Sequence, residues 1–191
     1  MHALRFNRLT VDELLAVARA HQARLHDHAR DEVRAWGGRV ATCVRGWEDA
    51  RDAELRARRH LSEARDRRRD DEDSLRQLLT ALHSDVGPLP TDLAALLDLP
   101  AAALADALAP VVAWMRGLAG VDARRVTAAA ARTAALVEHA AQEQTAARAH
   151  VDALAGMAAA EEELRRRLAA SAYVLRGLMD ADALFPAPEA Q

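Results

Sequence analysis

Prolines are distributed unevenly along this chain of 191 residues, and their positions constrain the fold more than any other sequence feature. No proline precedes Pro88, and none lies between Pro110 and Pro186. Proline removes a backbone donor and clashes with the preceding helical turn, so long tracts without it can form continuous helices. The hydrophobic residues are mainly Ala and Leu, and only 3% of the chain is aromatic, a composition that favours helices over sheets. We therefore expect an all-α fold with two long helical tracts.

The first tract covers residues 10–85 and is expected to form one long helix or a kinked pair of helices. Thr10 and Glu13 have the spacing of a capping box, which predicts a helix start at Val11. A stripe with alternating steps of three and four indicates a coiled-coil seam. Its members are Val33, Trp36, Val40, Cys43, Trp47, Ala50, Glu54, Ala57, Leu61, Ala64, Arg68, Asp71, Leu75, Leu78 and Leu82. The polar middle of this seam is expected to pack loosely or to project into water.

A break in the first tract is predicted near Gly37-Gly38. The seam gains an extra step of four just before Trp36, and each glycine weakens a helix interior by about 1 kcal/mol relative to Ala. Both a kink and a full turn are consistent with this pattern.

Residues 86–120 are expected to form a small helical head of two short helices. Thr91 or Asp92 can cap the first helix, Pro110 is expected to interrupt the second, and Trp114 and Met115 are expected to lie in the core. The second long helix should then cover residues 121–180, with Asp122 as its cap, and residues 181–191 should form a frayed tail.

Folding back across the head would make the two long helices antiparallel. This register places Trp47 near Met157 and Trp36 near Leu168, so these four residues are predicted to be structural anchors. The overall expectation is a long antiparallel helical hairpin or coiled-coil bundle, forming a single all-helical unit over residues 1–191.

Composition argues against several kinds of partner. The formal net charge of −3 provides no basic field for nucleic acid, and no apolar stretch has the length of a membrane span. The N-terminal residues carry no apolar run of signal-peptide length. The single cysteine, Cys43, fits a reducing compartment and the role of a small buried hydrophobe. We therefore expect a cytoplasmic protein that neither binds nucleic acid nor inserts into a membrane.

Residues 51–73 form a charged segment with eight Arg and eight acidic residues. Because the two signs cancel and no aromatic residue is present, we interpret it as a solvated helix with neighbouring salt bridges. It also supplies a candidate partner surface, formed by Arg58, Arg65, Arg67, Arg68 and Arg69. Neutralising Arg67, Arg68 and Arg69 together is expected to leave stability nearly unchanged.

Two groups of titratable residues are candidates for a metal site and for an acid/base site. The first group, which could supply two or three ligands to a metal on one helix face, is His21, His26, His28, Asp27, Asp31 and Glu32. The alternative is ordinary exposed histidines, so no metal or other cofactor is assigned. The second group is Glu143, His150 and Glu161, which fall on the apolar seam of the last helix and form either a buried acid/base pair or register-fixing polar contacts. No catalytic residue is assigned.

The segment Ala35-Trp36-Gly37-Gly38, followed by Trp47 and a charged helix, resembles the Trp-x-Gly turn of the small helical-hairpin substrates of type VII secretion. The resemblance implies a turn between two helices at this motif and a tyrosine-containing export signal near the C-terminus. Tyr173 departs from that signal, because Gly177 stands where the family has an acidic residue. The chain is also longer than these substrates.

These patterns favour a non-enzymatic structural or adaptor protein that binds a helical partner or itself. The first long tract carries extra apolar residues beside its seam, such as Leu14, Leu55 and Leu79, so a homodimer is the expected assembly. One alternative is a secretion substrate or partner of the Trp-x-Gly type. The second alternative is a metal-binding helical-bundle enzyme.

Overall fold

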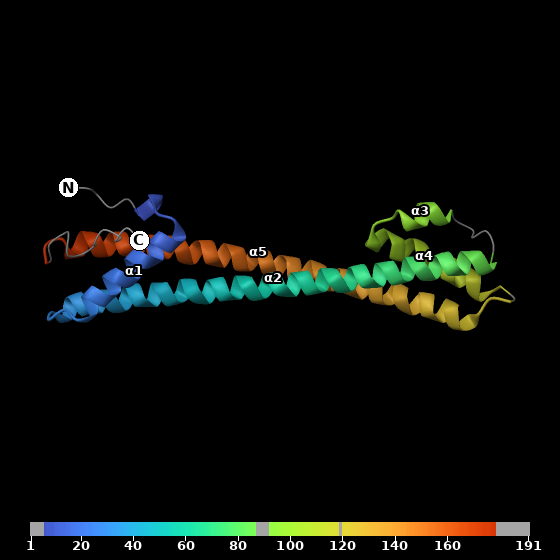
Figure 1. The fold of residues 1–191 in the computed structure, drawn as a ribbon, viewed down its shortest axis with the longest axis horizontal. Helices are drawn as coiled ribbons and strands as arrows, with labels where there is room; N and C mark the ends of the chain where they lie inside the picture. The colour runs from blue at the N-terminus through green and yellow to red at the C-terminus, as the bar shows by residue number, and fades with distance from the viewer. Residues whose placement is uncertain (1–5, 87–91, 119, 179–191) are drawn as a thin grey trace. The chain divides into compact units, whose positions relative to one another are not determined.

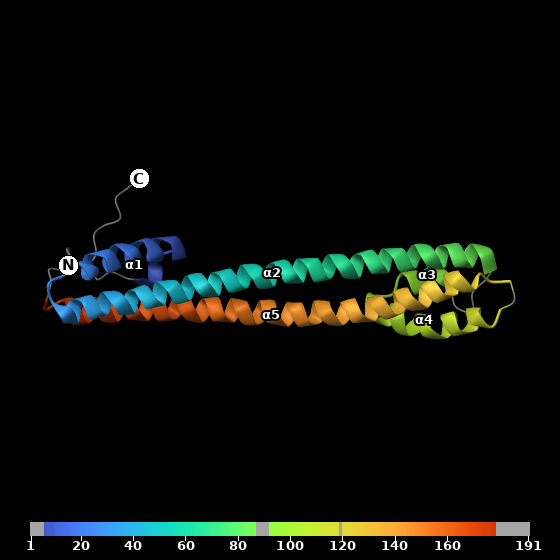
Figure 2. The same ribbon diagram turned by 90° about the horizontal axis from the view of Figure 1, so that it is seen from below.

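The computed structural model describes residues 6–86, 92–118 and 120–178, and these residues contain helices and no strand (Figure 1). The elements in order are η1 (Phe6–Arg8), α1 (Val11–His26), α2 (Asp31–Val86), α3 (Leu93–Leu97), α4 (Ala101–Arg116) and α5 (Ala123–Leu175). Figures 1 and 2 show the long helices α2 and α5 side by side. The predicted all-α helical hairpin, with two short helices in the 86–120 region, is confirmed.

The contacts within the chain define two compact units. The first unit consists of Met1–Arg56 and Val151–Gln191, and the second consists of Ala57–His150. Both long helices contribute to both units. The expectation of a single all-helical unit over residues 1–191 stays a prediction.

In the first unit, α1 lies antiparallel to the start of α2. The predicted capping box begins α1: the Thr10 hydroxyl accepts from the Glu13 amide at 3.3 Å, and the Glu13 carboxylate accepts from the Thr10 amide at 2.8 Å. Arg19 of α1 then pairs with Glu48 of α2 at 2.5 Å. The predicted helix start at Val11 is confirmed.

Gly37 and Gly38 lie inside α2, so the predicted full turn at these residues is wrong, while the alternative of a kink stays a prediction. The chain turns earlier, over residues 27–30, where Arg34 donates to the carbonyl oxygens of His28 at 2.8 Å and Ala29 at 3.1 Å. A Cβ added to Gly37 would stand 3.0 Å from the Leu25 Cβ of α1. Gly37 therefore allows α1 to approach α2 closely, and the Trp-x-Gly segment is not the turn that its resemblance implied.

The core of the first unit is formed by α1, α2 and α5. Its fully buried side chains include Leu14, Leu25, Val33, Val40, Leu164, Leu168 and Leu175. Of the predicted anchors, Trp47 and Leu168 are buried, while Trp36 and Met157 are half-buried. The pairing of Trp47 with Met157 and of Trp36 with Leu168 stays a prediction.

Arg165 of α5 holds the N-terminal segment in the first unit. It donates to the carbonyl oxygen of Phe6 and to that of Leu9, the latter at 3.0 Å. Glu161, one turn earlier in α5, accepts from the same guanidinium at 2.6 Å. Glu161, predicted as a seam polar residue, therefore orients Arg165.

In the second unit, α3 and α4 pack against the end of α2 and the start of α5. The core is formed by Leu75, Leu79, Leu82, Leu96, Leu104, Leu108, Val111, Val112, Met115, Val126, Ala129 and Leu136. Asp92 caps α3 by accepting from the Ala94 amide at 3.0 Å, while Thr91 lies outside the described residues. Asp122 caps α5 in the same way through the Arg124 amide at 2.9 Å, as predicted.

Two expectations for the head are wrong. Pro110 does not interrupt the second short helix, because α4 runs through it from Ala101 to Arg116. Buried Leu108 and Val111 on either side of Pro110 hold both halves of α4 on the core. Trp114 is 36% exposed, because Met115 and not Trp114 continues the buried stripe of α4.

The end of α5 differs slightly from its expected position. The helix ends at Leu175, and Leu178 donates to the Leu175 carbonyl in the turn that follows. The predicted tail, residues 181–191, lies outside the described residues.

Candidate functional site

The five arginines proposed as a partner surface divide into two groups. Arg58, Arg67 and Arg69 are exposed on α2. Arg68, which is half-buried, and Arg65, which is also exposed, contact Glu143 of α5, with Arg65 Nε donating at 3.2 Å and Arg68 Nε donating at 2.6 Å. Arg65 and Arg68 therefore connect the two long helices within the second unit.

Arg68 belongs to a longer ion-pair network. Its Nη1 donates to Glu72 at 2.6 Å, and Glu72 also accepts from Arg76 at 2.6 Å. Arg76 in turn donates to the carbonyl oxygen of Leu99 at 3.2 Å, which ties α2 to the segment between α3 and α4. The expectation that the polar middle of the seam projects into water is wrong for Arg68, whose side chain is 23% exposed.

Asp71 forms a second polar contact between α2 and α5. Its side chain is buried, and it accepts from Arg132 at 2.9 Å and pairs with His139. A buried carboxylate is costly unless it is paired and hydrogen-bonded, and both conditions are met here. Asp71 was expected to pack loosely, but its two partners lie 61 and 68 residues away in the sequence, and no local pattern points to them.

Glu143, His150 and Glu161 were predicted to form either a buried acid/base pair or register-fixing polar contacts. Glu143 and Glu161 form ion pairs with arginines, which fits the second alternative. Burial raises the pKa of Glu143, but hydrogen bonds and positive charge from Arg68 and Arg65 outweigh burial and hold that pKa below its ordinary value. His150 is half-buried, and Glu161 pairs with Arg165. Glu143 is therefore held in its ionised form by two arginines, which suits it to fixing the register of the helices and not to exchanging protons.

The first unit contains a buried hydrogen bond that sequence reasoning missed. His21 of α1 and Ser171 of α5 are both fully buried, and their Nε2 and Oγ atoms lie 2.7 Å apart. Both residues sit on apolar stripes of their helices, which is the one sequence signal that could have linked them. The contact joins α1 to α5 within the hydrophobic core.

The histidines of the metal hypothesis do not converge. His21 is buried, His26 is exposed, and the His28 ring accepts from the Arg30 amide at 3.1 Å in the turn between α1 and α2. Among residues 6–86, 92–118 and 120–178, no three His, Cys, Asp or Glu side chains gather closely enough to hold a metal ion.

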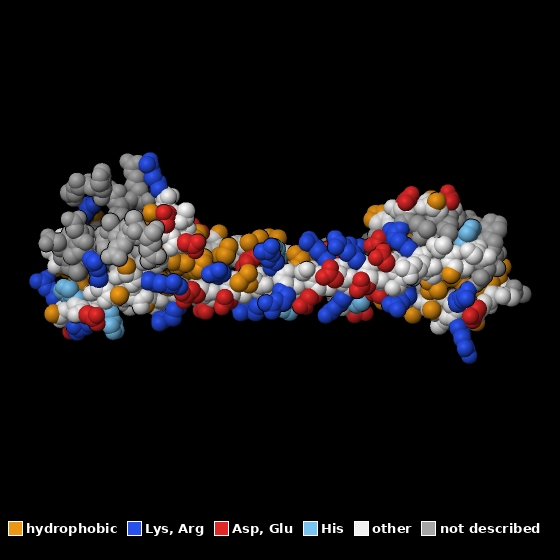
Figure 3. All heavy atoms as spheres, in the orientation of Figure 1, with side chains coloured by type: hydrophobic (Ala, Val, Ile, Leu, Met, Phe, Trp, Pro, Cys, Tyr) orange, Lys and Arg blue, Asp and Glu red, His pale blue; other side chains and the backbone are white. Residues whose placement is uncertain are grey.

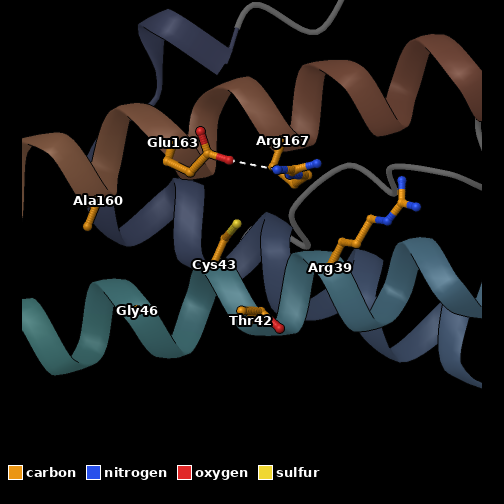
Figure 4. A pocket seen from close by; sticks show the side chains of 7 residues that line it. All are labelled: Arg39, Thr42, Cys43, Gly46, Ala160, Glu163 and Arg167. Atoms are coloured by element: carbon orange, nitrogen blue, oxygen red, sulfur yellow. Dashed lines mark hydrogen bonds and ion pairs between the residues drawn. The ribbon is translucent and has the colours of Figure 1, made fainter.

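A pocket of about 440 Å³ lies between α2 and α5 in the first unit (Figure 4). Its lining consists of Arg39, Thr42, Cys43, Gly46, Ala160, Glu163 and Arg167. Cys43 was expected to be a buried hydrophobe, and it is half-buried, with its thiol directed toward α5. The Glu163 carboxylate, 2.8 Å from Arg167, and the neighbouring Cys43 sulfur raise the Arg167 pKa, although burial opposes this. Arg167 therefore stays charged and paired.

Besides Leu55 of α2, which is 45% exposed, the exposed large hydrophobic side chains among the described residues of the first unit lie on α5. They are Val151, Leu154, Tyr173 and Val174, and Tyr173 is 80% exposed. Apolar residues are spread around α5 and are not confined to the side that packs on α2. Figure 3 shows hydrophobic side chains between charged ones of both signs along the long helices. Contiguous exposed apolar patches are typical of protein interaction sites, whereas single exposed apolar side chains are ordinary protein surface.

Comparison of this chain with protein-family models, curated proteins and solved structures gave no match. No helix in the described part of the chain combines the length and the apolar character that a membrane span requires.

Proposed function

We propose that this chain is a non-enzymatic structural or adaptor protein that acts by packing exposed helical surface against another helical protein, with a second copy of itself as the first partner. The observation that carries this proposal is the solvent-exposed apolar surface of α5, above all Tyr173 and Val151, which are 80% and 62% exposed. Covering such surface with a second helix gains free energy in proportion to the apolar area removed from water.

The polar residues support the same proposal. Glu143, Asp71 and His139 are engaged in contacts between α2 and α5, and the buried His21 contacts Ser171. These side chains specify how the helices of one chain pair, which leaves the outer helix surfaces for a partner. The cytoplasm is part of the proposal, because the single Cys43 suits a reducing compartment.

Co-expression of two copies with different affinity tags tests this function. Purification through one tag should retain the other copy, or a helical protein whose binding can be repeated with purified components. Each copy eluting alone, with no helical protein that rebinds after purification, would contradict the proposal. A copy lacking the exposed side chains, Val151→Ser with Tyr173→Ser, serves as the matched control and should retain less of its partner.

A further inference from the structure

The solvent side of α5 in the first unit carries a second seam, which points away from the core. Its eight positions alternate in steps of three and four, the spacing of a coiled coil, and all eight are exposed. They are Asp152, Ala155, Ala159, Glu162, Arg166, Ala169, Tyr173 and Arg176. We call this set the outer seam. The buried residues Leu164, Leu168 and Ser171 lie on the opposite side of the same helix.

The outer seam is complementary to itself when a second copy is placed antiparallel to it. With the pair centred on Leu164, each layer joins one residue to a different one on the second copy. The layers are Asp152 with Arg176, Ala155 with Tyr173, Ala159 with Ala169, and Glu162 with Arg166, each formed twice by symmetry. Every charged residue therefore meets the opposite charge, and the exposed Tyr173 ring meets a small side chain.

Other placements of a second copy lose this match. A parallel copy sets Asp152, Glu162 and Arg166 each against the same charge, which is unfavourable. Moving the antiparallel copy by one heptad in either direction leaves each charged side chain opposite Ala or Tyr, or outside the seam. Charge complementarity thus selects both the direction and the register.

The alanines and the exposed ion pairs make this register physically accessible. Ala155, Ala159 and Ala169 let two helix backbones approach closely. Within the chain, Arg166 lies 4.0 Å from Glu162 and 3.1 Å from Glu163, and the Arg166 and Glu162 side chains are 67% and 64% exposed. Such a pair is weak in water and can exchange for a partner on a second chain.

We propose that the outer seam is a homodimerisation surface on which a second copy of this chain docks antiparallel, centred on Leu164. This proposal rests on the proposed function, because it names the partner and one surface for the same interaction, which contains Tyr173 of the exposed apolar side chains on α5. Two copies related by a two-fold axis bury the same face on each chain, as closed dimers do.

Site-directed disulfide formation tests the proposed register. In a Cys43→Ser background, which removes the only cysteine, one preparation carries Ala159→Cys and another carries Ala169→Cys. A disulfide requires Cα atoms within about 7 Å, and the docked register brings position 159 of one copy to position 169 of the other. Mild oxidation of the mixed preparations should therefore give a covalent dimer.

Each preparation oxidised alone is the matched control and should form no covalent dimer. Two copies of position 159 would stand ten residues apart along the helices, which is about 15 Å. A covalent dimer from Ala159→Cys alone, or none from the mixture, would overturn the proposed seam.

Charge reversal provides an independent measurement. Glu162→Arg places Arg opposite Arg166 and should weaken self-association at least tenfold, whereas the double reversal Glu162→Arg with Arg166→Glu should restore it. Asp49→Arg, on an exposed position of α2 outside the seam, is the control and should leave association unchanged. Equal association of all three variants would contradict the seam. If tagged copies co-purify while the cysteine mixture gives no covalent dimer, the seam is wrong and the proposed function stands.

Discussion

Two adjacent glycines have different surroundings in the first unit. Gly37 lies where a Cβ would meet Leu25 at 3.0 Å, while a Cβ on Gly38 would meet nothing within 4 Å. In a helix interior, Ala is favoured over Gly by about 1 kcal/mol. Gly38→Ala should therefore raise the free energy of unfolding by about that amount. Gly37→Ala should lower it by about 1 kcal/mol, because the added methyl group overpacks the α1 contact. Urea unfolding measures the free energy of unfolding of both variants. Equal stabilisation by the two substitutions would argue against close packing at Gly37.

Trp47 offers a second test at the scale of one residue. Its ring is buried in the core of the first unit, and its indole Nε1 has no hydrogen-bond acceptor among the described residues. Trp47→Ala should lower the free energy of unfolding by about 3 kcal/mol through loss of packing. Trp47→Phe keeps an aromatic ring and should cost less than about half of that. A loss below about 0.5 kcal/mol for Trp47→Ala would mean that Trp47 is not an anchor.

At the scale of elements, three consecutive arginines of α2 are not equivalent. Arg68 contacts Glu72 and Glu143, while Arg67 and Arg69 are exposed. Arg68→Ala should lower the free energy of unfolding by about 1–2 kcal/mol, because it removes two hydrogen bonds between charged groups. Arg67→Ala and Arg69→Ala are matched controls and should stay within about 0.5 kcal/mol of the wild type. Chemical denaturation of the three variants checks this prediction. An equal loss of unfolding free energy in all three would contradict the structural role of Arg68. Because Arg68 makes these contacts, neutralising all three arginines together is now expected to cost about as much as Arg68→Ala.

The pairing of α2 with α5 should also depend on pH through Glu143. Its pKa is depressed in the folded chain, so the ionised carboxylate stabilises the fold above the unfolded-state pKa of about 4.3. This stabilisation is lost as the pH falls through the folded-state pKa. Glu143→Gln should therefore cost about 1 kcal/mol at neutral pH and progressively less in acid. Denaturation curves across this pH range make the comparison, and a cost that does not change with pH would exclude the ion pair as its source.

Patterns of neighbouring residues predicted the positions of the helices well. They did not predict contacts between residues that are far apart in the sequence. The capping residues Thr10 and Asp122 act on amides within three residues, so their roles can be deduced from neighbouring positions. The pairing of Asp71 with Arg132 and His139 depends on which turn of α5 faces α2, and single-sequence periodicity does not determine that choice. Gly37 was misread for the same reason, because its close approach to Leu25 requires knowing the position of α1.

For the candidate site, too, sequence patterns indicated the kind of surface but not its contacts. Composition and charge patterning predicted a partner surface on α2, formed by Arg58, Arg65, Arg67, Arg68 and Arg69. Arg65 and Arg68 contact Glu143 of α5, and the role of the five arginines as a partner surface stays a prediction. The sequence did not predict the outer seam of α5, because alanine is common throughout this helix and its positions do not mark one face. Its meaning depends on exposure, which only the packing of α2 against α5 reveals.

The whole molecule is expected to associate through its exposed helical surface. A single copy leaves apolar side chains such as Tyr173 and Val151 in water, and a second copy provides helices of the same kind to cover them. Dimers are the commonest closed assemblies of identical chains, so a mass of two copies is expected.

Sedimentation equilibrium of the purified full chain at tens of micromolar measures this self-association. We predict a mass twice the 20.7 kDa of one chain, falling toward one copy on dilution. A monodisperse species with the mass of one chain throughout that concentration range would contradict self-association.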